Sequence, residues 1–428
     1  MVAAGLSSGE CASKASLFAR ALTALGPRGR DARLWWVPGR IEFLGKHTDY
    51  CGGPSLVCAI ERGFAVASCA RADRTVRIID ACSGESADGL LDEELRSRRA
   101  HWSNYPFTVA RRIVRNFRGA LRGVDLAFAS DLPPAAGLSS SSGLIVATFL
   151  ALSQANELAR HDEYRDAIAS LEDLAGYLGA IENGSDFRGL AGDRGVGTQG
   201  GSQDHTAILC ASPGALAQYR FVPVHLERRV ALPNDHTFVV AGSGVAAAKA
   251  GTALELYNRA SRRAADAFAA LRAATGSSAP SLAVLLSDLP NGIDDATRAL
   301  RGHPDLLLRV AQLHSETRLV RAAGDALEIG DLVVLGAVVD ASQSTAERLL
   351  SNQVPETIAL ARSARELGAV AASAFGAGFG GSVYALVETG GAEEFRHRWV
   401  EAYSAAFPNR RSGATFFITR AGPPATSL

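Results

Sequence analysis

The sequence predicts a protein of two domains that mix helices and strands. Its 428 residues exceed the length that one hydrophobic core usually organises, which favours two domains of roughly 200 residues each. Strand-like runs lie in the first half, whereas the second half is rich in helical patterns. Turn residues cluster at Leu232–Asp235, so we expect an N-terminal domain over residues 1–232 and a C-terminal domain over residues 233–428.

Elements of the first half follow from apolar spacing and turn signals. Leu17, Ala21 and Leu25 recur at helical spacing before Gly26-Pro27, which predicts a helix over 12–25. Further along the chain the pattern predicts strands at 33–37, 64–69 and 124–129 and helices at 103–117 and 144–156. A glycine-dense segment, residues 184–201, precedes another helix that we expect to begin near Thr206.

In the second half, a strand is expected from 237 to 241, followed by helices at 251–275, 306–323 and 345–367. The middle helix carries one largely apolar stripe through Leu306, Val310, Leu313, Thr317 and Val320. Residues 375–381 form a glycine-rich turn before a strand at 382–387. This succession again predicts a mixture of helices and strands.

Composition narrows the function classes. The 44 basic and 44 acidic residues cancel, which removes the broad positive field of a nucleic-acid or anionic-membrane binder, so a small-molecule substrate is the default. No stretch approaches the roughly 20 apolar residues of a membrane span, and residues 1–25 lack a secretion signal. The six cysteines show no metal-binding spacing and are expected to be buried free thiols. We therefore expect a cytoplasmic protein.

A serine-rich segment carries the clearest chemistry. A strand and a Pro133-Pro134 turn lead into Gly137-Leu138-Ser139-Ser140-Ser141, which opens a helix. A helix N-terminus offers unpaired N–H groups and partial positive charge, which suits a polyphosphate, and a serine hydroxyl can ligate Mg²⁺. The Walker ending Gly-Lys-Ser/Thr is missing. The alternative is a serine-rich helix cap without a ligand.

Three further segments combine polar and glycine residues. In Pro38–Tyr50, Asp49 and His47 are candidates to hydrogen-bond sugar hydroxyls and Arg40 to neutralise phosphate charge, although a solvated turn is the alternative. Asp204 follows the glycine-dense segment, either as an ordinary helix N-cap or as the group that orients or deprotonates an acceptor hydroxyl. The run Gly376–Gly381 is either a turn or a surface of backbone groups.

The order of these segments resembles the GHMP kinases, and most closely the galactokinases. Residues 39–50, GRIEFLGKHTDY, resemble the galactokinase signature Gly-Arg-x-Asn-Leu-Ile-Gly-Glu-His-Thr-Asp-Tyr. Residues 137–142 are similar to the family's phosphate loop Gly-Leu-Ser-Ser-Ser-Ala, and residues 376–381 to its third motif. Weaker matches, such as Trp102-Ser103-Asn104-Tyr105 and Ile181-Glu182-Asn183, lie between them, so the resemblance covers almost the whole chain.

The resemblance implies an α+β, two-domain GHMP kinase fold, with an N-terminal domain like domain 2 of ribosomal protein S5 and a ferredoxin-like C-terminal domain. It also implies ATP and Mg²⁺ as cofactors and a sugar as acceptor, bound in a cleft between the domains. The implied roles are catalysis for Asp204 and Arg40; ATP binding for Gly137, Leu138, Ser139, Ser140, Ser141 and Trp102; Mg²⁺ binding for Ser141; sugar binding for Lys46, His47, Asp49, Tyr257 and Gly201; and a wall behind the transferred group for Gly376, Gly378 and Gly380.

Lys46 is the most informative departure, because the galactokinase signature has Glu there. An ammonium group donates hydrogen bonds and attracts anions, whereas a carboxylate accepts. This reversal raises the hypothesis that the acceptor is a sugar acid such as a uronate. The alternative is that Lys46 turns to solvent and galactose still binds. His205, where the family has Gln, is a second departure that could add a pH dependence.

The interpretation is an ATP-dependent kinase that phosphorylates the anomeric hydroxyl of galactose or a related sugar. Three alternatives stay open: a kinase for a sugar acid or other monosaccharide selected by Lys46, a catalytically silent regulator that binds ATP and sugar, and a non-enzymatic scaffold on the same fold. Its partners are expected to be these small molecules, without nucleic acid or membrane. The sequence leaves the oligomeric state open between a monomer and a weak dimer.

Overall fold

The computed structural model describes residues 1, 5–97, 101–246 and 251–428, and its first half is built on a twisted sheet. Eight strands of the described chain form this sheet in the order β12-β1-β2-β5-β3-β4, with β6 paired to β2 and β7 to β6. The pairs are antiparallel except β3 with β5. The strands are β1 (Arg33–Leu44), β2 (Pro54–Ala70), β3 (Thr75–Asp80), β4 (Ser86–Leu90), β5 (Val124–Ser130), β6 (Ala215–Arg220), β7 (His225–Ala231) and β12 (Thr426–Ser427).

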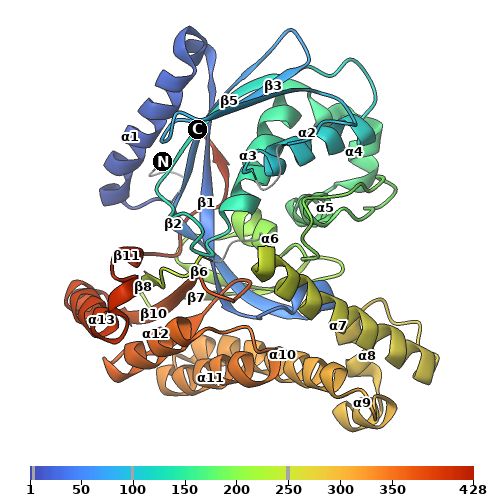
Figure 1. Cartoon of the computed structure of the whole chain (residues 1–428), viewed down its shortest axis with the longest axis vertical. Helices are drawn as coiled ribbons and strands as arrows, with labels where there is room; N and C mark the ends of the chain where they lie inside the picture. Colours follow the sequence, from blue (N-terminus) through green and yellow to red (C-terminus); the bar gives the residue numbers. More distant parts are fainter. Residues whose placement is uncertain (2–4, 98–100, 247–250) are drawn as a thin grey trace.

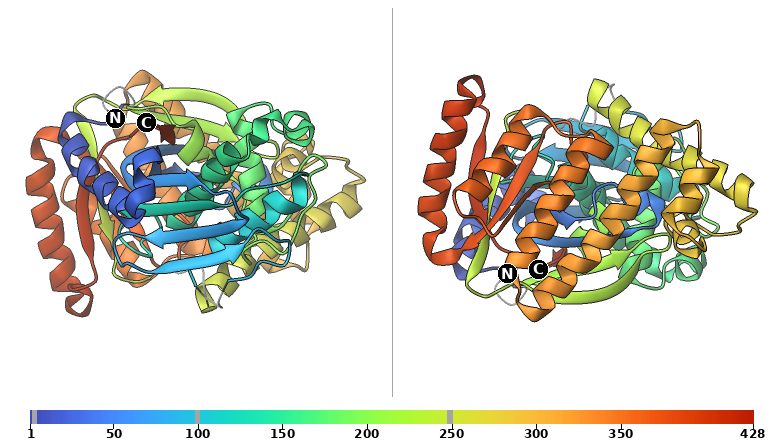
Figure 2. Two further views of the ribbon diagram at one scale, coloured as in Figure 1. Left: turned by 90° about the horizontal axis from the view of Figure 1, so that it is seen from above. Right: turned by 90° about the horizontal axis from the view of Figure 1, so that it is seen from below.

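Helices cover both faces of this sheet (Figures 1 and 2). Side chains alternate along β2, so Ala65 packs with α1 residues on one face while Phe64 and Val66 join the main core on the other. The helices are α1 (Ser8–Ala24), α2 (Asn104–Asn116), α3 (Ser140–Ala155), α4 (Asp162–Ala167), α5 (Leu171–Asn183) and α6 (Gln203–Cys210). The candidate phosphate loop lies between the end of β5 at Ser130 and the start of α3 at Ser140. Its position is therefore set by these two elements.

A second, antiparallel sheet has the order β11-β8-β10-β9. Its strands are β8 (His236–Gly242), β9 (Ala371–Ala374), β10 (Ser382–Glu388) and β11 (Thr415–Thr419), and α12 (Pro355–Glu366) and α13 (Ala392–Ala406) pack against it around Trp399. The chain order of helix-linked strands and this strand order are those of a ferredoxin-like domain. Between β8 and β9 run α7 (Gly251–Thr275), α8 (Leu282–Asp288), α9 (Ile293–Ala299), α10 (Pro304–Ile329) and α11 (Leu332–Thr345), which form a helical layer along the lower edge of Figure 1.

Short helical turns complete the chain. They are Gly26–Asp31, Asp49–Cys51, Leu158–Arg160, Thr389–Gly391 and Pro408–Arg410, together with a π-helical turn at Ala346–Leu350. Val320, Leu327 and Leu335 of α10 and α11 belong to the same core as the first sheet, so the helical layer is anchored to it. In the described part of the chain, every helix is too short or too polar to cross a membrane.

Most predicted elements are present, and the differences have physical causes. The helix predicted over 345–367 is wrong: the chain leaves the helix at Ser351, whose φ is 55°, and Pro355 starts α12. The strand predicted at 33–37 continues to Leu44, because the charged residues beyond it are buried in a cavity rather than solvated. The expectation of buried cysteines holds for Cys51, Cys58, Cys69 and Cys210, whereas Cys82 is exposed and Cys11 half-buried; all six are free.

Candidate active site

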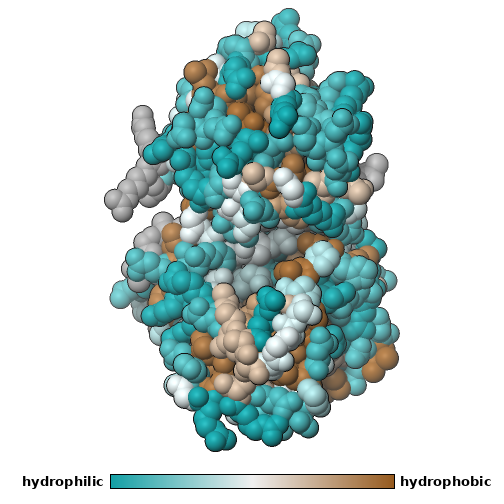
Figure 3. Space-filling view, turned by 90° about the vertical axis from the view of Figure 1, so that its right-hand side faces the viewer, coloured by the Kyte–Doolittle hydropathy of each residue, from teal (hydrophilic) through white to brown (hydrophobic). Residues whose placement is uncertain are grey.

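One large cavity gathers residues from both halves of the chain. It has a volume of about 760 Å³ and is bordered by β1, the start of α3, α6, α7 and the third glycine motif. In the space-filling view the surface is hollowed between an upper and a lower part of the molecule (Figure 3). The predicted site residues that line the cavity are Arg40, His47, Asp49, Trp102, Gly137, Ser139, Ser140, Ser141, Gly201, Asp204, Tyr257 and Gly376. Among the described residues, Lys46, Leu138, Gly378 and Gly380 are not part of its lining.

The serine loop presents a helix N-terminus to this cavity. The backbone is left-handed at Ala135, Gly137 and Ser139, with φ of 51°, 73° and 62°, and α3 begins at the next residue, Ser140. Ser139 occupies the N-cap position of α3 without a capping hydrogen bond from its side chain, and its buried hydroxyl has no hydrogen-bond partner among the described residues. First-turn N–H groups and a buried hydroxyl therefore border the cavity, an arrangement that suits phosphate oxygens.

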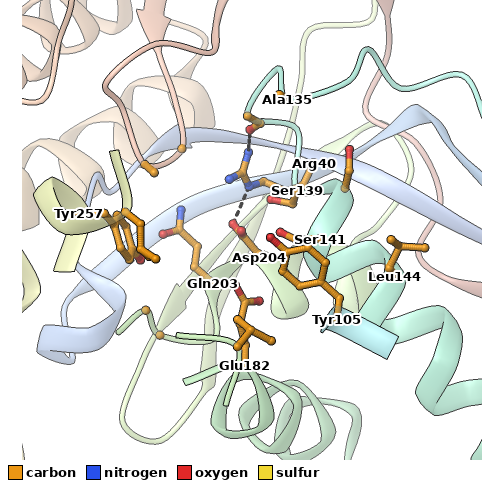
Figure 4. Close-up of a pocket in the computed structure, with 18 of the residues that line it drawn as sticks. Arg40, Tyr105, Ala135, Ser139, Ser141, Leu144, Glu182, Gln203, Asp204 and Tyr257 are labelled. Carbon is orange, nitrogen blue, oxygen red and sulfur yellow. Dashed lines mark hydrogen bonds and ion pairs between the residues drawn. The ribbon is translucent and has the colours of Figure 1, made fainter. Parts of the chain in front are cut away.

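Arg40 joins this loop to the candidate catalytic carboxylate. Its Nε donates to Oδ1 of Asp204 at 2.7 Å, and its Nη1 donates to the carbonyl oxygen of Gly137 at 2.7 Å. Figure 4 shows the guanidinium group between the loop and Asp204. Arg40 is almost fully buried, so the guanidinium plane is held in place by packing and by both hydrogen bonds. One side chain thus fixes the position of the carboxylate relative to the phosphate loop.

Asp204 lies inside the first turn of α6, not at its N-cap. The helix begins at Gln203, so the expectation of a start near Thr206 and the reading of Asp204 as an ordinary N-cap are wrong. Gly200 and Gly201 let the chain enter the helix early, in close contact with neighbouring side chains. The second carboxylate oxygen of Asp204 accepts from the hydroxyl of Ser142 at 3.4 Å, while the side chain keeps 19% exposure toward the cavity.

Glu182, at the end of α5, is a cavity residue to which sequence reasoning gave no role. Its carboxylate accepts from the hydroxyls of Ser142 at 3.0 Å and Thr198 at 3.3 Å, and His205 Nε2 lies 3.4 Å away. The local signal was an acidic residue that ends an apolar helix directly before the glycine-dense segment. Glu182, Ser141 and Asp204 provide the oxygen donors that Mg²⁺ prefers, and one or two carboxylates suffice where substrate phosphates complete the shell.

The opposite end of the cavity contains His47, Asp49, Gly201 and Tyr257, and Figure 4 shows Tyr257 on the far side of Asp204 from Leu144. Asp49 Oδ2 accepts the backbone N–H of Gln203 at 3.2 Å. A Cβ at Gly201 would lie 2.4 Å from that oxygen, so only glycine allows the segment to pass Asp49 this closely. This end is therefore walled by an aromatic ring, a carboxylate and bare backbone, which suits a polar ring such as a sugar.

His47 is a neutral wall residue. Burial, reinforced by the nearby Arg309 charge, lowers the pKa of His47 to about 3. Its Nε2 lies 3.0 Å from the carbonyl oxygen of Ala377 and must donate to it, so Nδ1 accepts from the Tyr50 hydroxyl at 2.7 Å. Both ring nitrogens are thus engaged within the protein. The ring thereby connects Tyr50 with Ala377 of the third glycine motif.

The third glycine motif closes the cavity behind Arg40. A Cβ at Gly376 would lie 3.1 Å from the carbonyl oxygen of Gly137 and 3.2 Å from Arg40 Nη2, and the φ of Gly376 is 80°. Gly378 contacts Asn352 in the helix break instead, where an added Cβ would lie 2.3 Å from the Asn352 carbonyl oxygen. Gly376 therefore borders the cavity, whereas Gly378 and Gly380 support the turn from outside.

Lys46 does not face the cavity. Its side chain is buried and Nζ donates to the hydroxyl of Ser342 at 3.1 Å, beside the buried Glu316. Glu316 also accepts the backbone N–H groups of Gly45 and Lys46. The predicted Lys46 side chain turned to solvent is therefore wrong. The pairing of Lys46 with a uronate stays a prediction, and the ammonium group lies outside the cavity lining.

Glu42, two residues after Arg40 on β1, also lines the cavity, and the pKa of its carboxyl group is strongly shifted. Burial raises the pKa of Glu42 to about 8, although the Lys46 and Arg40 charges oppose the rise and the Glu316 and Asp204 carboxylates add to it. At neutral pH the Glu42 carboxyl of the unliganded protein is therefore mostly protonated.

Glu42→Gln is expected to stabilise the unliganded protein above pH 5. The unfolded chain releases the Glu42 proton near pH 4.5 while the folded protein keeps it until about pH 8, so Glu42 lowers stability progressively as pH rises through this window. A glutamine cannot titrate, so the gain should reach a few kcal/mol, at most about 3 kcal/mol at pH 7. Thermal unfolding at pH 4.5 and pH 7.5 checks this: equal shifts in melting temperature at both pH values would contradict it.

Comparisons with known proteins agree with this geometry. Residues 28–69 match the model of the galactokinase galactose-binding signature, residues 104–186 that of the GHMP kinases N-terminal domain and residues 319–405 that of the GHMP kinases C-terminal domain. A galactokinase of Roseiflexus sp. strain RS-1 is 31% identical over 407 residues, which cover 90% of each chain. The chain belongs to the galactokinase family. A Chloroflexus aurantiacus galactokinase is also 31% identical, over 88% of this chain and 89% of its own.

Two solved structures share the fold of this chain. The structure of Lactococcus lactis galactokinase complexed with galactose matches with a TM-score of 0.78 at 23% identity, over 95% of this chain and 97% of that chain. An L. major mevalonate kinase in complex with R-mevalonate matches with a TM-score of 0.56 at 16% identity, over 91% and 96%. The predicted membership of the GHMP kinases and the two-domain α+β fold are thereby confirmed.

Proposed function

We propose that this member of the galactokinase family transfers the γ-phosphate of ATP to the anomeric hydroxyl of galactose or a closely related neutral sugar. The observation that carries the proposal is the Arg40 bridge, which holds the Asp204 carboxylate and the Gly137 carbonyl of the serine loop at the border of one cavity. Phosphoryl transfer needs a phosphate cradle, a positive charge and a group that aims the acceptor hydroxyl. The candidates for these three roles, the serine loop, Arg40 and Asp204, all border the same cavity.

In this mechanism the N-terminus of α3 and the serine hydroxyls hold the nucleotide phosphates. Leu144 lies on the side of the cavity away from Tyr257 (Figure 4), and Trp102 also lines the cavity and would contact the nucleotide. Asp49, Tyr257 and the Gly201 backbone hold the sugar. Asp204 accepts the proton of the attacking hydroxyl, while Arg40 holds the carboxylate in position and offsets charge on the transferring group.

Mg²⁺ would be held by Ser141 and Glu182 together with oxygens of the nucleotide. Both residues line the cavity, and Glu182 is a buried carboxylate surrounded by hydroxyl groups. When bound, the ion would neutralise charge on the phosphates. The Ser142 hydroxyl lies 3.0 Å from Oε2 of Glu182 and 3.4 Å from Oδ2 of Asp204, so its single proton is shared between the metal-binding carboxylate and the catalytic one.

A coupled ADP-release assay tests the proposal across galactose, arabinose, glucose, glucuronate and galacturonate. We expect galactose to give the largest kcat/KM, with a sugar 1-phosphate as the product, identified by ³¹P NMR. ATP and sugar binding without ADP release would instead favour a catalytically silent regulator. The absence of Mg-ATP binding would favour a scaffold on the same fold.

Lys46→Glu and Lys46→Met test the role of Lys46 within the same assay. Because Lys46 points to Ser342 and Glu316, neither variant should shift preference between galactose and galacturonate. Lys46→Glu should instead lower the melting temperature more than Lys46→Met, since it adds a third carboxyl group beside Glu42 and Glu316 in a buried region. Strong wild-type activity on galacturonate that Lys46→Met abolishes selectively would revive the sugar-acid hypothesis.

A further inference from the structure

Glu42 is a buried carboxylic acid in the lining of the cavity. Side chains alternate along β1, so Glu42 lies on the same face as Arg40, and both line the cavity. Glu42 is 3% exposed, and its Oε1 has no hydrogen-bond partner among the described residues. The galactokinase signature has Asn at this place, so the carboxyl group is a feature of this chain.

The two cationic side chains near Glu42, Lys46 and Arg40, form hydrogen bonds with other groups. Lys46 donates to Ser342, and Arg40 donates to Asp204 and Gly137. Neither forms an ion pair with Glu42 within the part of the chain that the structure describes. An unpaired polar group that is nine-tenths buried costs free energy unless a partner satisfies it. A ligand in the cavity is the partner that the surrounding protein does not supply.

We propose that Glu42 is a further sugar-binding residue, which donates a hydrogen bond from its neutral carboxyl group to a hydroxyl oxygen of the acceptor sugar. The inference rests on the proposed function, because it assigns the ligand of the same cavity. Burial is the main reason for expecting a neutral acid, because it disfavours the carboxylate more strongly than the Lys46 and Arg40 charges favour it. The Glu316 and Asp204 carboxylates, and nucleotide phosphates when bound, add negative charge that acts in the same direction as burial. Such a group can donate to a hydroxyl oxygen of a neutral ring without adding negative charge to the cavity.

The charged and titratable groups around Glu42 come from four elements and the turn after β1. They are Arg40 on β1, Lys46 in the turn, Asp204 on α6, Glu316 on α10 and Tyr384 on β10. Burial raises the pKa of Tyr384 far above its usual value. Burial likewise raises the pKa of the Cys51 thiol to about 11 and of the Cys58 thiol to about 12. Between pH 6.5 and 9.5 Glu42, with a pKa of about 8, is therefore the group to follow.

The test measures sugar affinity without phosphoryl transfer, by calorimetric titration of galactose into wild-type protein, Glu42→Gln and Glu42→Leu from pH 6.5 to 9.5. In wild type the Kd should rise above pH 8, by up to about thirtyfold at pH 9.5 if only the neutral acid binds. Glu42→Gln, whose amide donates at every pH, should give a flat profile. Glu42→Leu should bind about tenfold more weakly than wild type at pH 7.

Single-position deoxygalactoses identify the hydroxyl group that Glu42 contacts. The analogue that lacks this group should bind wild type and Glu42→Leu equally, whereas the other analogues should keep the difference between the two proteins. Circular dichroism of each variant at each pH shows whether the protein is folded during the titration. Glu42→Gln and Glu42→Leu, each checked by circular dichroism, thus distinguish the loss of a hydrogen bond to the sugar from unfolding of the protein.

Three results would overturn the inference: wild-type affinity that is independent of pH, Glu42→Leu binding as tight as wild type, or affinity that increases as Glu42 ionises. Because calorimetry needs no turnover, a protein that binds galactose through Glu42 but releases no ADP would refute only the proposed function. ADP release with a pH-independent Kd would refute only the role of Glu42.

Discussion

Asp204→Asn should lower kcat by about 10²–10⁴-fold while leaving ATP affinity within a few fold of wild type. The substitution keeps size and hydrogen-bonding shape beside Arg40 but removes the group that takes the proton of the sugar hydroxyl. Steady-state kinetics with galactose and calorimetric titration with an ATP analogue measure the two quantities separately.

Asp325→Asn is a matched control for Asp204→Asn. Asp325 also pairs with an arginine, Arg228, at 2.7 Å, but it lies on the exposed face of α10 outside the cavity lining. The kcat of Asp325→Asn should stay within about twofold of wild type. Asp325 lies outside the cavity lining, and the loss of a surface ion pair should hardly change the stability of the fold. Full turnover by Asp204→Asn would remove this carboxylate from the mechanism.

Arg40→Leu should lower kcat by about 10²–10³-fold, the second largest effect that we expect. The leucine removes the charge near the transferring group and both hydrogen bonds that connect Asp204 with the carbonyl of Gly137. Arg40→Lys keeps the charge but cannot make both bonds in the same geometry, so it should restore only part of the rate. The measurement is kcat/KM for galactose and for ATP in each variant.

The double variant Arg40→Leu/Asp204→Asn decides whether the two residues act as a unit. If Arg40 works partly by aiming Asp204, the combined loss should be clearly smaller than the product of the single losses. Losses that multiply in full would mean that Arg40 and Asp204 contribute independently. In that case their 2.7 Å ion pair would be structural only.

The sequence predicts the fold well where apolar spacing is regular and less well where charged residues are buried. The helix α7 matches its predicted bounds, whereas β1 was predicted to end at Val37 although it runs to Leu44. From the local sequence, Arg40 and Glu42 were expected in a solvated turn, because charged side chains are seldom buried. In the folded protein both side chains are buried, because segments that are distant in the sequence form a cavity around them.

The candidate site shows the same limit. Motif order was enough to find Arg40, the serine loop and Asp204, which the fold brings to one cavity. The direction of the Lys46 side chain was not predictable, because its partners Ser342 and Glu316 lie on helices far along the chain. Nothing in the sequence singled out Glu42, because a buried carboxyl oxygen without a hydrogen-bond partner among the described residues can be recognised only in three dimensions.

A crystal structure with galactose and a non-hydrolysable ATP analogue tests the central claim most directly. We predict that the γ-phosphate lies at the N-terminus of α3, within hydrogen-bond distance of the Ser139–Ser141 backbone, and that the anomeric oxygen lies about 2.6–3.2 Å from an oxygen of Asp204. A nucleotide bound away from the serine loop, or a sugar whose anomeric oxygen points away from Asp204, would contradict it.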